Sequence, residues 1–105
     1  MGNDKALNMI GLCMRAGKLT SGEFSCDKAI KAGTAKLIIV ASDASDNTKK
    51  AFRDATNFYK VNYTEYGTKE TLGACLGKEL RASVAILDEG FAKSIQEKMN
   101  KTEEP

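Results

Sequence analysis

Apolar residues recur with a helical period in five stretches of the chain. In residues 4–16, Leu7, Ile10 and Met14 follow one another at spacings of three and four, which is typical of one face of an amphipathic helix. Gly17 comes directly after this stretch and is a typical helix stop. The same reasoning predicts four further helices, over residues 22–32, 45–59, 69–76 and 88–100.

Short hydrophobic runs lie between these helices. The run KLIIVAS, residues 36–42, is continuous and rich in β-branched residues, so it predicts a strand buried on both faces. Residues 19–21, 61–66 and 82–87 predict three further extended segments. Helices that alternate with strands predict one α/β domain. We expect a three-layer α/β/α sandwich with a small, mostly parallel or mixed sheet of about four strands and five helices.

This domain is expected to span residues 1–105, with residues 99–105 as a frayed tail. Polar residues at the predicted helix starts are candidate N-caps. They are Ser45 or Asp46, Thr68 and Asp88. The third helix is expected to bury a stripe made of Phe52, Ala55 and either Phe58 or Tyr59.

The composition indicates a soluble globular protein. Hydrophobic residues make up 42% and charged residues 29% of the 105 residues, and no run approaches the ~18 apolar residues of a membrane helix. The first 19 residues are amphipathic and include Asp4, which fits a folded helix better than a signal peptide. We therefore expect a cytoplasmic protein without a membrane partner, and a monomer when free because the chain has no coiled-coil heptads.

The residue types available for catalysis are few. The chain has no histidine, and its three cysteines are widely spaced in predicted helices, where they are expected to pack as small hydrophobes. We therefore expect no catalytic residue, metal site or cofactor. One alternative is an enzyme that uses Asp43 and Asp88, since each follows a buried strand, where α/β sheets place ligands. The simpler interpretation is that each aspartate caps the helix that follows it.

The positive charge is concentrated in the first part of the chain. Residues 1–60 contain ten Lys or Arg and six Asp or Glu, whereas residues 61–105 contain six and eight. A polyanion would be attracted to the first part, although a solvated charged surface explains so modest a bias equally well.

The segment of residues 18–33 combines a predicted helix start with lysines. A helix that begins near Gly22 presents unpaired backbone N–H groups and the positive end of its dipole. With Lys18 before the turn and Lys28 further along the helix, this arrangement suits a phosphate or a base edge of a nucleic acid. The alternative is that Ser21 caps the helix and the lysines are merely solvated, and the local sequence alone favours it.

The loop GKELRAS, residues 77–83, places one apolar residue among charged ones. Leu80 beside Arg81 could pack against splayed RNA bases. The alternative, a leucine turned into the core, is favoured by the local sequence alone.

Two distant segments together resemble a known family. SGEFSCDKAIKAGTAKLIIVASDAS and, later, LGACLGKELRASVAIL are similar to the ribosomal proteins of the L-seven-Ae and L-thirty-e family, and most of all to its small bacterial, YlxQ-like branch. The similarity covers about residues 3–98. It implies an α/β/α sandwich that binds kink-turn RNA without catalysing a reaction, with ribosomal proteins as further partners.

The resemblance also implies site residues. Gly22 matches the glycine that opens the RNA-binding helix of the family, Lys28 matches a lysine of that helix, and Leu80 matches an aliphatic residue that packs on extruded bases. Asp43 falls in the family's acidic loop after the first buried strand. The complete predicted RNA-binding set is Lys18, Ser21, Gly22, Glu23, Phe24, Ser25, Lys28, Asp43, Lys49, Leu80 and Arg81, and Lys36 is a further candidate for phosphate neutralisation.

One pair of residues departs from the family pattern. The family has Asn-Glu or Lys-Gln where this chain has Phe24 and Ser25, and that polar pair hydrogen bonds guanine edges in sheared G·A pairs. Phe24 is unable to form such bonds, whereas it could stack on a base. A second hypothesis is therefore a protein-interaction module that docks on a ribosome-associated partner with weak or no RNA specificity.

Overall fold

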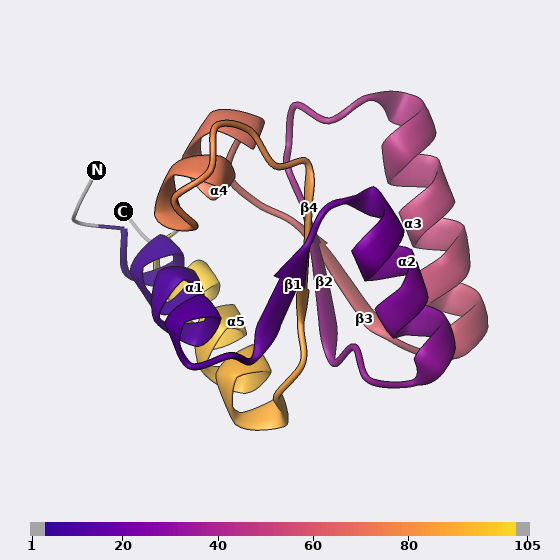
Figure 1. Cartoon of the computed structure of the whole chain (residues 1–105), viewed down its shortest axis with the longest axis horizontal. Coiled ribbons are helices and arrows are strands. Elements are labelled where there is room, and N and C mark those ends of the chain that lie inside the picture. Colours follow the sequence, from indigo (N-terminus) through magenta and orange to yellow (C-terminus); the bar gives the residue numbers. More distant parts are fainter. Residues whose placement is uncertain (1–3, 103–105) are drawn as a thin grey trace.

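The computed structural model describes residues 4–102, and Figure 1 shows its arrangement of five helices and four strands. In chain order the elements are α1 (Lys5–Arg15), β1 (Leu19–Ser21), α2 (Glu23–Ala32), β2 (Leu37–Val40), α3 (Asp46–Tyr59), β3 (Asn62–Glu65), α4 (Lys69–Cys75), β4 (Ser83–Ile86) and α5 (Glu89–Thr102). Each predicted helix and strand is present, with bounds that differ from the prediction by at most two residues.

The four strands form one mixed sheet in the order β1-β4-β2-β3. β4 pairs antiparallel with both β1 and β2, and only β2 and β3 run parallel. In Figure 1, α2 and α3 cover one face of the sheet and α1, α4 and α5 cover the other. The predicted three-layer α/β/α sandwich with a mixed sheet is thus confirmed, although antiparallel pairs outnumber the parallel one.

The centre of the sheet supplies the core. All residues of β2 and of β4 are buried, as expected for strands covered by helices on both faces. The helix starts are held by polar caps: the side chains of Asp4, Ser45 and Thr68 accept backbone N–H groups of the helices that follow them. Asp88 accepts from the N–H of Phe91 at 2.9 Å. The predicted caps at Ser45, Thr68 and Asp88 are confirmed.

The buried stripe of α3 differs from the prediction. Phe52 is buried, but Phe58 is 75% and Tyr59 is 42% exposed, so the expectation that one of them belongs to the core is wrong. Thr56 takes the inward position instead, four residues after Phe52, and its hydroxyl donates to the carbonyl of Phe52 at 2.7 Å. The last turn of α3 leaves its two aromatic rings in edge-to-face contact, 4.9 Å apart.

The C-terminal helix is longer than predicted. α5 continues to Thr102, and Met99 is buried in the core. The expectation of a frayed tail that begins at residue 99 is therefore wrong as far as residue 102, and residues 103–105 lie outside the described part. Among residues 4–102, no helix is both long and apolar enough to cross a membrane.

The cysteines pack as the sequence predicts. Cys13 and Cys26 are buried, and Cys75 is half-buried. Burial raises the pKa of each of the three thiols to about 11. Because a thiol in this state stays protonated at neutral pH, the cysteines act here as apolar packing groups.

A loop-built edge of the sheet as the candidate binding site

Three loops meet at one edge of the sheet, at the top of Figure 1, where β1 ends, β2 ends and β4 begins. We call this the upper edge and define it by residues 21–25, 41–45 and 77–82. Antiparallel pairing explains the meeting of the first and last segments, since Ser21 lies opposite Val84 in the register. The backbone N–H of Gly22 continues this pairing and donates to the carbonyl of Ser83 at 3.0 Å.

A side-chain hydrogen bond joins the two segments that resemble the family. Nε of Arg81 donates to Oγ of Ser21 at 3.0 Å, although the two residues are 60 positions apart. The same guanidinium donates from Nη1 to the carbonyl of Leu80 at 2.9 Å. Arg81 therefore ties the loop that contains Leu80 to the end of β1.

This bond also decides between the two interpretations of Ser21. Ser21 is the last residue of β1, Gly22 is the N-cap of α2, and no described side chain caps this helix. The expectation that Ser21 caps α2 is wrong, because its hydroxyl accepts from Arg81 instead. The first turn of α2 thus keeps unpaired N–H groups at the positive end of its dipole.

Gly22 is required at this position by its backbone. Its φ of 96° and ψ of 153° fall in a region that L side chains rarely adopt, and a Cβ there would meet nothing within 4 Å. The open space in front of Gly22 leaves the start of α2 accessible to a ligand backbone.

Leu80 stands out from the loop before β4. Its side chain is 56% exposed, so the alternative that it turns into the core is wrong. The loop rests on α4: the N–H of Lys78 donates to Gly73 at 2.8 Å and the N–H of Arg81 donates to Lys69 at 3.0 Å. A Cβ on Gly73 would lie 2.7 Å from the carbonyl oxygen of Glu79 and 2.9 Å from Cα of Leu80.

Gly73 is not among the residues predicted from the sequence. The one local indication of its importance is that a glycine stands inside a predicted helix, where it is unfavourable. The loop that contacts this glycine is evident only in the folded structure. The absence of a side chain at Gly73 lets the loop that carries Leu80 lie directly against α4.

Phe24 is the most exposed large apolar side chain at the upper edge. It is 81% exposed in the first turn of α2 and lies between two open hollows. One, of about 410 Å³, is bordered also by Glu23 and Phe52. The other, of about 350 Å³, is bordered by Ser25 and Lys28. An aromatic ring in such a position offers a face for stacking, with a lysine beside it.

Asp43 has a structural partner. Its carboxylate accepts from the backbone N–H of Lys69 at 2.8 Å and so ties the loop after β2 to the start of α4. It does not cap α3, where Ser45 is the N-cap. Asp43 and Asp88 lie at opposite ends of the sheet because β2 and β4 are antiparallel, so a catalytic site that shares them is excluded. Within residues 4–102, no group of three or more Cys, Asp or Glu residues is placed to hold a metal ion.

One predicted site residue, Lys18, lies away from the upper edge, and another, Lys49, lies beside it in an ion pair. Lys18 precedes β1 and accepts from the N–H of Leu87 at 2.8 Å, at the opposite end of the strand from Gly22. At ~3.3 Å per strand residue its Cα is about 13 Å from that of Gly22. Lys49 lies in the first turn of α3 and forms an ion pair of 3.7 Å with Glu65.

Glu65 is the centre of a polar cluster. It also pairs with Arg53 at 3.1 Å and accepts a hydrogen bond of 2.8 Å from Tyr63. This hydrogen bond, with the neighbouring cations, holds the pKa of Glu65 below its usual value, whereas burial and the same bond raise the pKa of Tyr63 to about 12. The positive charge of Lys49 is therefore partly neutralised within the protein.

The fold and the upper edge together define a class: small α/β/α domains in which loops and one helix start meet at the same edge of a mixed sheet. Within this class, residues 4–96 match the family model of the ribosomal protein L7Ae/L30e/S12e/Gadd45 family. The chain belongs to this family.

Two curated relatives are similar over most of their length. A protein named RNA-binding protein YlxQ from Bacillus subtilis (strain 168) is 42% identical over 87 residues, which are 83% of this chain and 87% of the relative. A protein of the same name from Enterococcus faecium is 43% identical over 93 residues, 89% of each chain.

Solved structures agree with the fold. A Bacillus halodurans protein of unknown function superposes with a TM-score of 0.89 at 32% identity, covering 93% of this chain and 99% of that one. The Giardia lamblia 15.5kD RNA binding protein superposes with a TM-score of 0.75 at 23% identity, covering 92% of this chain and 83% of that one, and shows the fold alone.

Proposed function

We propose that this protein binds structured RNA at the upper edge of its sheet, as a non-enzymatic, ribosomal or ribosome-associated protein of the cytoplasm that is monomeric when free. The RNA is a kink-turn or a related bent element. Family membership and two relatives named as RNA-binding proteins support the proposal. The observation on which it chiefly depends is the Arg81–Ser21 hydrogen bond, which makes one surface of two segments that are far apart in the sequence.

Each side of this surface offers a different interaction with RNA. The uncapped start of α2 presents N–H groups to a phosphate, and the exposed ammonium group of Lys28 lies one turn further along. Leu80 offers an exposed aliphatic group on which an unstacked base packs. RNA bends that extrude bases expose both kinds of group at once, whereas a regular duplex does not.

Phe24 and Ser25, which replace the polar pair of the family, determine the selectivity among RNAs that we propose. Neither side chain reproduces the hydrogen bonds of the family pair to sheared G·A pairs, while Phe24 presents its ring to solvent. We therefore expect recognition by shape, phosphate contact and stacking, with less dependence on G·A pairs than the family pattern implies.

Binding of a kink-turn RNA by a double variant tests the proposal. Lys28→Ala/Leu80→Ala is expected to lower affinity at least about tenfold, since one phosphate contact and one base contact are lost. Fluorescence anisotropy with a panel of labelled kink-turn and bent RNAs measures the effect. The matched control is Leu12→Ala/Lys50→Ala, which also removes one exposed leucine and one exposed lysine, from α1 and α3. Equal affinity of the double variant and wild type across the panel would refute the proposal.

A protein-interaction module is the second candidate, because Phe24 and Leu80 place two exposed apolar side chains at the same edge. Salt distinguishes the two functions. An RNA complex weakens steeply as salt rises, because counterions are released on binding, whereas an apolar protein contact responds little.

A further inference from the structure

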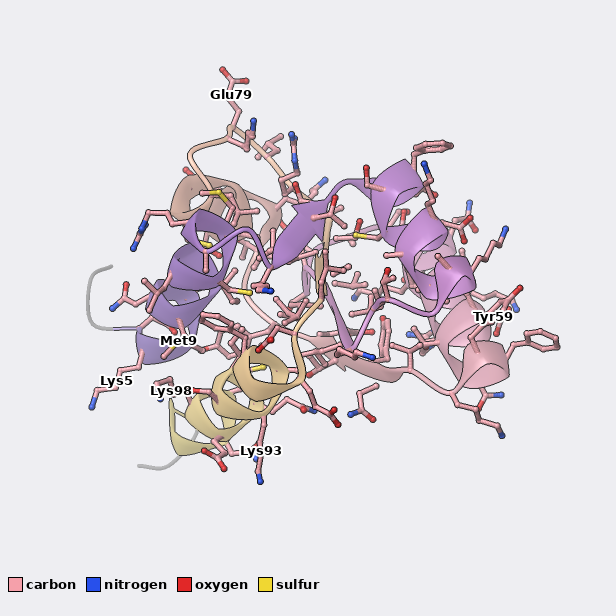
Figure 2. The ribbon with its side chains drawn as sticks, turned by 60° about the horizontal axis from the view of Figure 1, so that its bottom comes forward. Lys5, Met9, Tyr59, Glu79, Lys93 and Lys98 are labelled. Atoms are coloured by element: carbon pink, nitrogen blue, oxygen red, sulfur yellow. The ribbon has the colours of Figure 1, made fainter. Side chains whose placement is uncertain are left out.

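A second surface lies at the opposite edge of the sheet, which we call the lower edge. Here α2 and α3 end, β2 and β3 begin and α5 begins. An open hollow of about 600 Å³ lies between these elements. Figure 2 brings this edge forward and shows Lys93 on α5 and Tyr59 at the end of α3, with Glu79 of the upper edge at the far end of the view.

Lysines dominate the charged lining of this hollow. Lys31, Lys36, Lys60 and Lys93 border it, and Glu89 is the only acidic residue among residues 4–102 that does so. Lys31 is paired with Asp27 at 3.1 Å. Within the described part of the chain, the other three lysines have no carboxylate within 4.0 Å. Three of the four lysines that border the hollow therefore form no ion pair of 4.0 Å or less within the described part of the chain.

Helix dipoles explain only part of this cluster. Lys31 and Lys60 lie at the C-terminal ends of α2 and α3, where a cation is favoured. Lys36 lies just before β2, and Lys93 lies in the second turn of α5, so neither is near a helix C-terminus. The helix dipoles therefore do not account for Lys36 and Lys93 at this hollow.

The backbone of Lys60 is an independent indication. Lys60 caps α3 in the left-handed conformation with φ of 62°, and it is the one non-glycine residue among residues 4–102 with positive φ. The equivalent position of α2 is Gly33, which adopts this conformation without steric cost. Residues other than glycine that are held in this conformation cluster at functional sites.

We propose that the lower edge is a second RNA-binding site, which holds the phosphates of a regular helical segment. Lys36, Lys60 and Lys93 bind the phosphates, and the half-exposed ring of Tyr59 lines the same hollow and packs against the sugar backbone. Since the two edges lie at opposite ends of the strands, one protein would contact two segments of a folded RNA. This site goes beyond the proposed function, which concerns the upper edge alone.

An RNA duplex without any internal loop tests this site separately from the first. The variant Lys36→Ala/Lys60→Asn/Lys93→Ala removes the three charges, and asparagine keeps the left-handed conformation at residue 60. The matched control, Lys5→Ala/Lys50→Ala/Lys98→Ala, removes three lysines that do not border the hollow. Affinity for a labelled duplex of about 24 base pairs is measured by anisotropy between about 50 and 200 mM salt.

Wild type and the control are expected to bind the duplex equally. The triple variant is expected to bind roughly tenfold more weakly at about 50 mM salt. The slope of the logarithm of affinity against the logarithm of salt concentration is expected to be smaller by about 3, which is about one for each lost phosphate contact. Lys28→Ala/Leu80→Ala is expected to bind the duplex like wild type, because neither residue borders the lower hollow.

Three results would overturn the second site: no duplex binding by wild type, equal binding by the triple variant and the control, or loss of duplex binding by Lys28→Ala/Leu80→Ala. Failure of the proposed function shows in another measurement, since it concerns bent RNA at the upper edge. Thermal unfolding of each variant excludes misfolding as the cause of weaker binding.

Discussion

At the scale of single residues, the most informative positions are those that break a local rule. Gly22 adopts a conformation that other residues rarely reach, and Phe24 exposes four-fifths of its surface to water in the turn that follows. The sequence alone indicates that Phe24 and Ser25 depart from the family pair. Only the structure shows that the ring is exposed and lies between two hollows.

Restoration of the family pair is expected to change selectivity. Phe24→Asn/Ser25→Glu supplies an amide and a carboxylate at the start of α2, which can hydrogen bond guanine edges. We expect the preference for an RNA with two adjacent G·A pairs over the same RNA with G·C pairs to rise about tenfold, since such contacts contribute ~1–3 kcal/mol. Anisotropy titrations with both RNAs measure this ratio.

Phe24→Ala/Ser25→Ala is the control for this substitution, because it removes the ring without adding hydrogen-bonding groups. A ratio for Phe24→Asn/Ser25→Glu no higher than that of wild type would show that this turn does not contact the G·A pairs.

At the scale of elements, two features position the upper edge: the antiparallel pairing of β1 with β4, and the close contact of α4 with the loop before β4. The pairing brings the start of α2 beside this loop. The contact depends on Gly73, where only a hydrogen atom fits against the backbone of Glu79 and Leu80. Neither feature is visible in the local sequence, because each depends on residues that are not neighbours in the chain.

Gly73→Ala is expected to weaken RNA binding through the position of Leu80. The added methyl group would lie within 3.0 Å of loop backbone atoms, so the loop must shift. We expect an affinity loss comparable to that of Leu80→Ala, about tenfold, together with a lower melting temperature.

Gly11→Ala is the matched control, since its Cβ would meet the carbonyl oxygen of Cys75 at 2.9 Å, in the contact of α1 with α4. It is expected to lower the melting temperature while RNA affinity falls much less. Equal affinity of Gly73→Ala and wild type would show that the loop adapts and that Gly73 has no positioning role.

At the scale of the whole molecule, the fold separates two edges of different character. The upper edge combines an uncapped helix start with exposed Leu80 and Phe24, and the lower edge gathers lysines around a hollow. Between them lies a core that includes two fully buried thiols. Because burial raises the pKa of these thiols above its value in the unfolded chain, the stability of the fold depends on pH at alkaline values.

Alkaline pH is expected to destabilise the fold through the thiols. The pKa of Cys26 rises from 9.0 to about 11 on folding, so its stabilising contribution is complete below pH 9 and is lost as pH rises through 11. When the pH is raised from ~8 to ~10.5, the free energy of unfolding is expected to fall by about 2 kcal/mol because of this single thiol. Cys26→Ala is expected to reduce the alkaline loss by this amount.

Urea unfolding of wild type and Cys26→Ala at both pH values measures the difference. The comparison within each protein removes the constant packing effect of the substitution and the pH effects that the two proteins share. If the two proteins lost the same free energy between these pH values, the thiol of Cys26 would not be the cause.

The sequence by itself determined the elements and the layers of this protein. Periodic apolar residues, β-branched runs and polar caps act over one or a few turns, so they predict α1 to α5, β1 to β4 and caps such as Ser45 and Thr68. It also determined that Gly22, Lys28 and Leu80 were candidates, through the resemblance to a family to which the chain belongs.

The tertiary structure decided which candidates lie together. Strand direction placed Asp43 and Asp88 at opposite ends of the sheet and Lys18 at the lower edge. The reason is that β4 is antiparallel to β1 and β2, so its C-terminal end lies beside their N-terminal ends. The tertiary structure also pairs the hydroxyl of Ser21 with Arg81, so that Ser21 does not cap α2. It brings four lysines from three separate parts of the chain to one hollow. Such contacts depend on long-range pairing, which no local pattern of residues encodes.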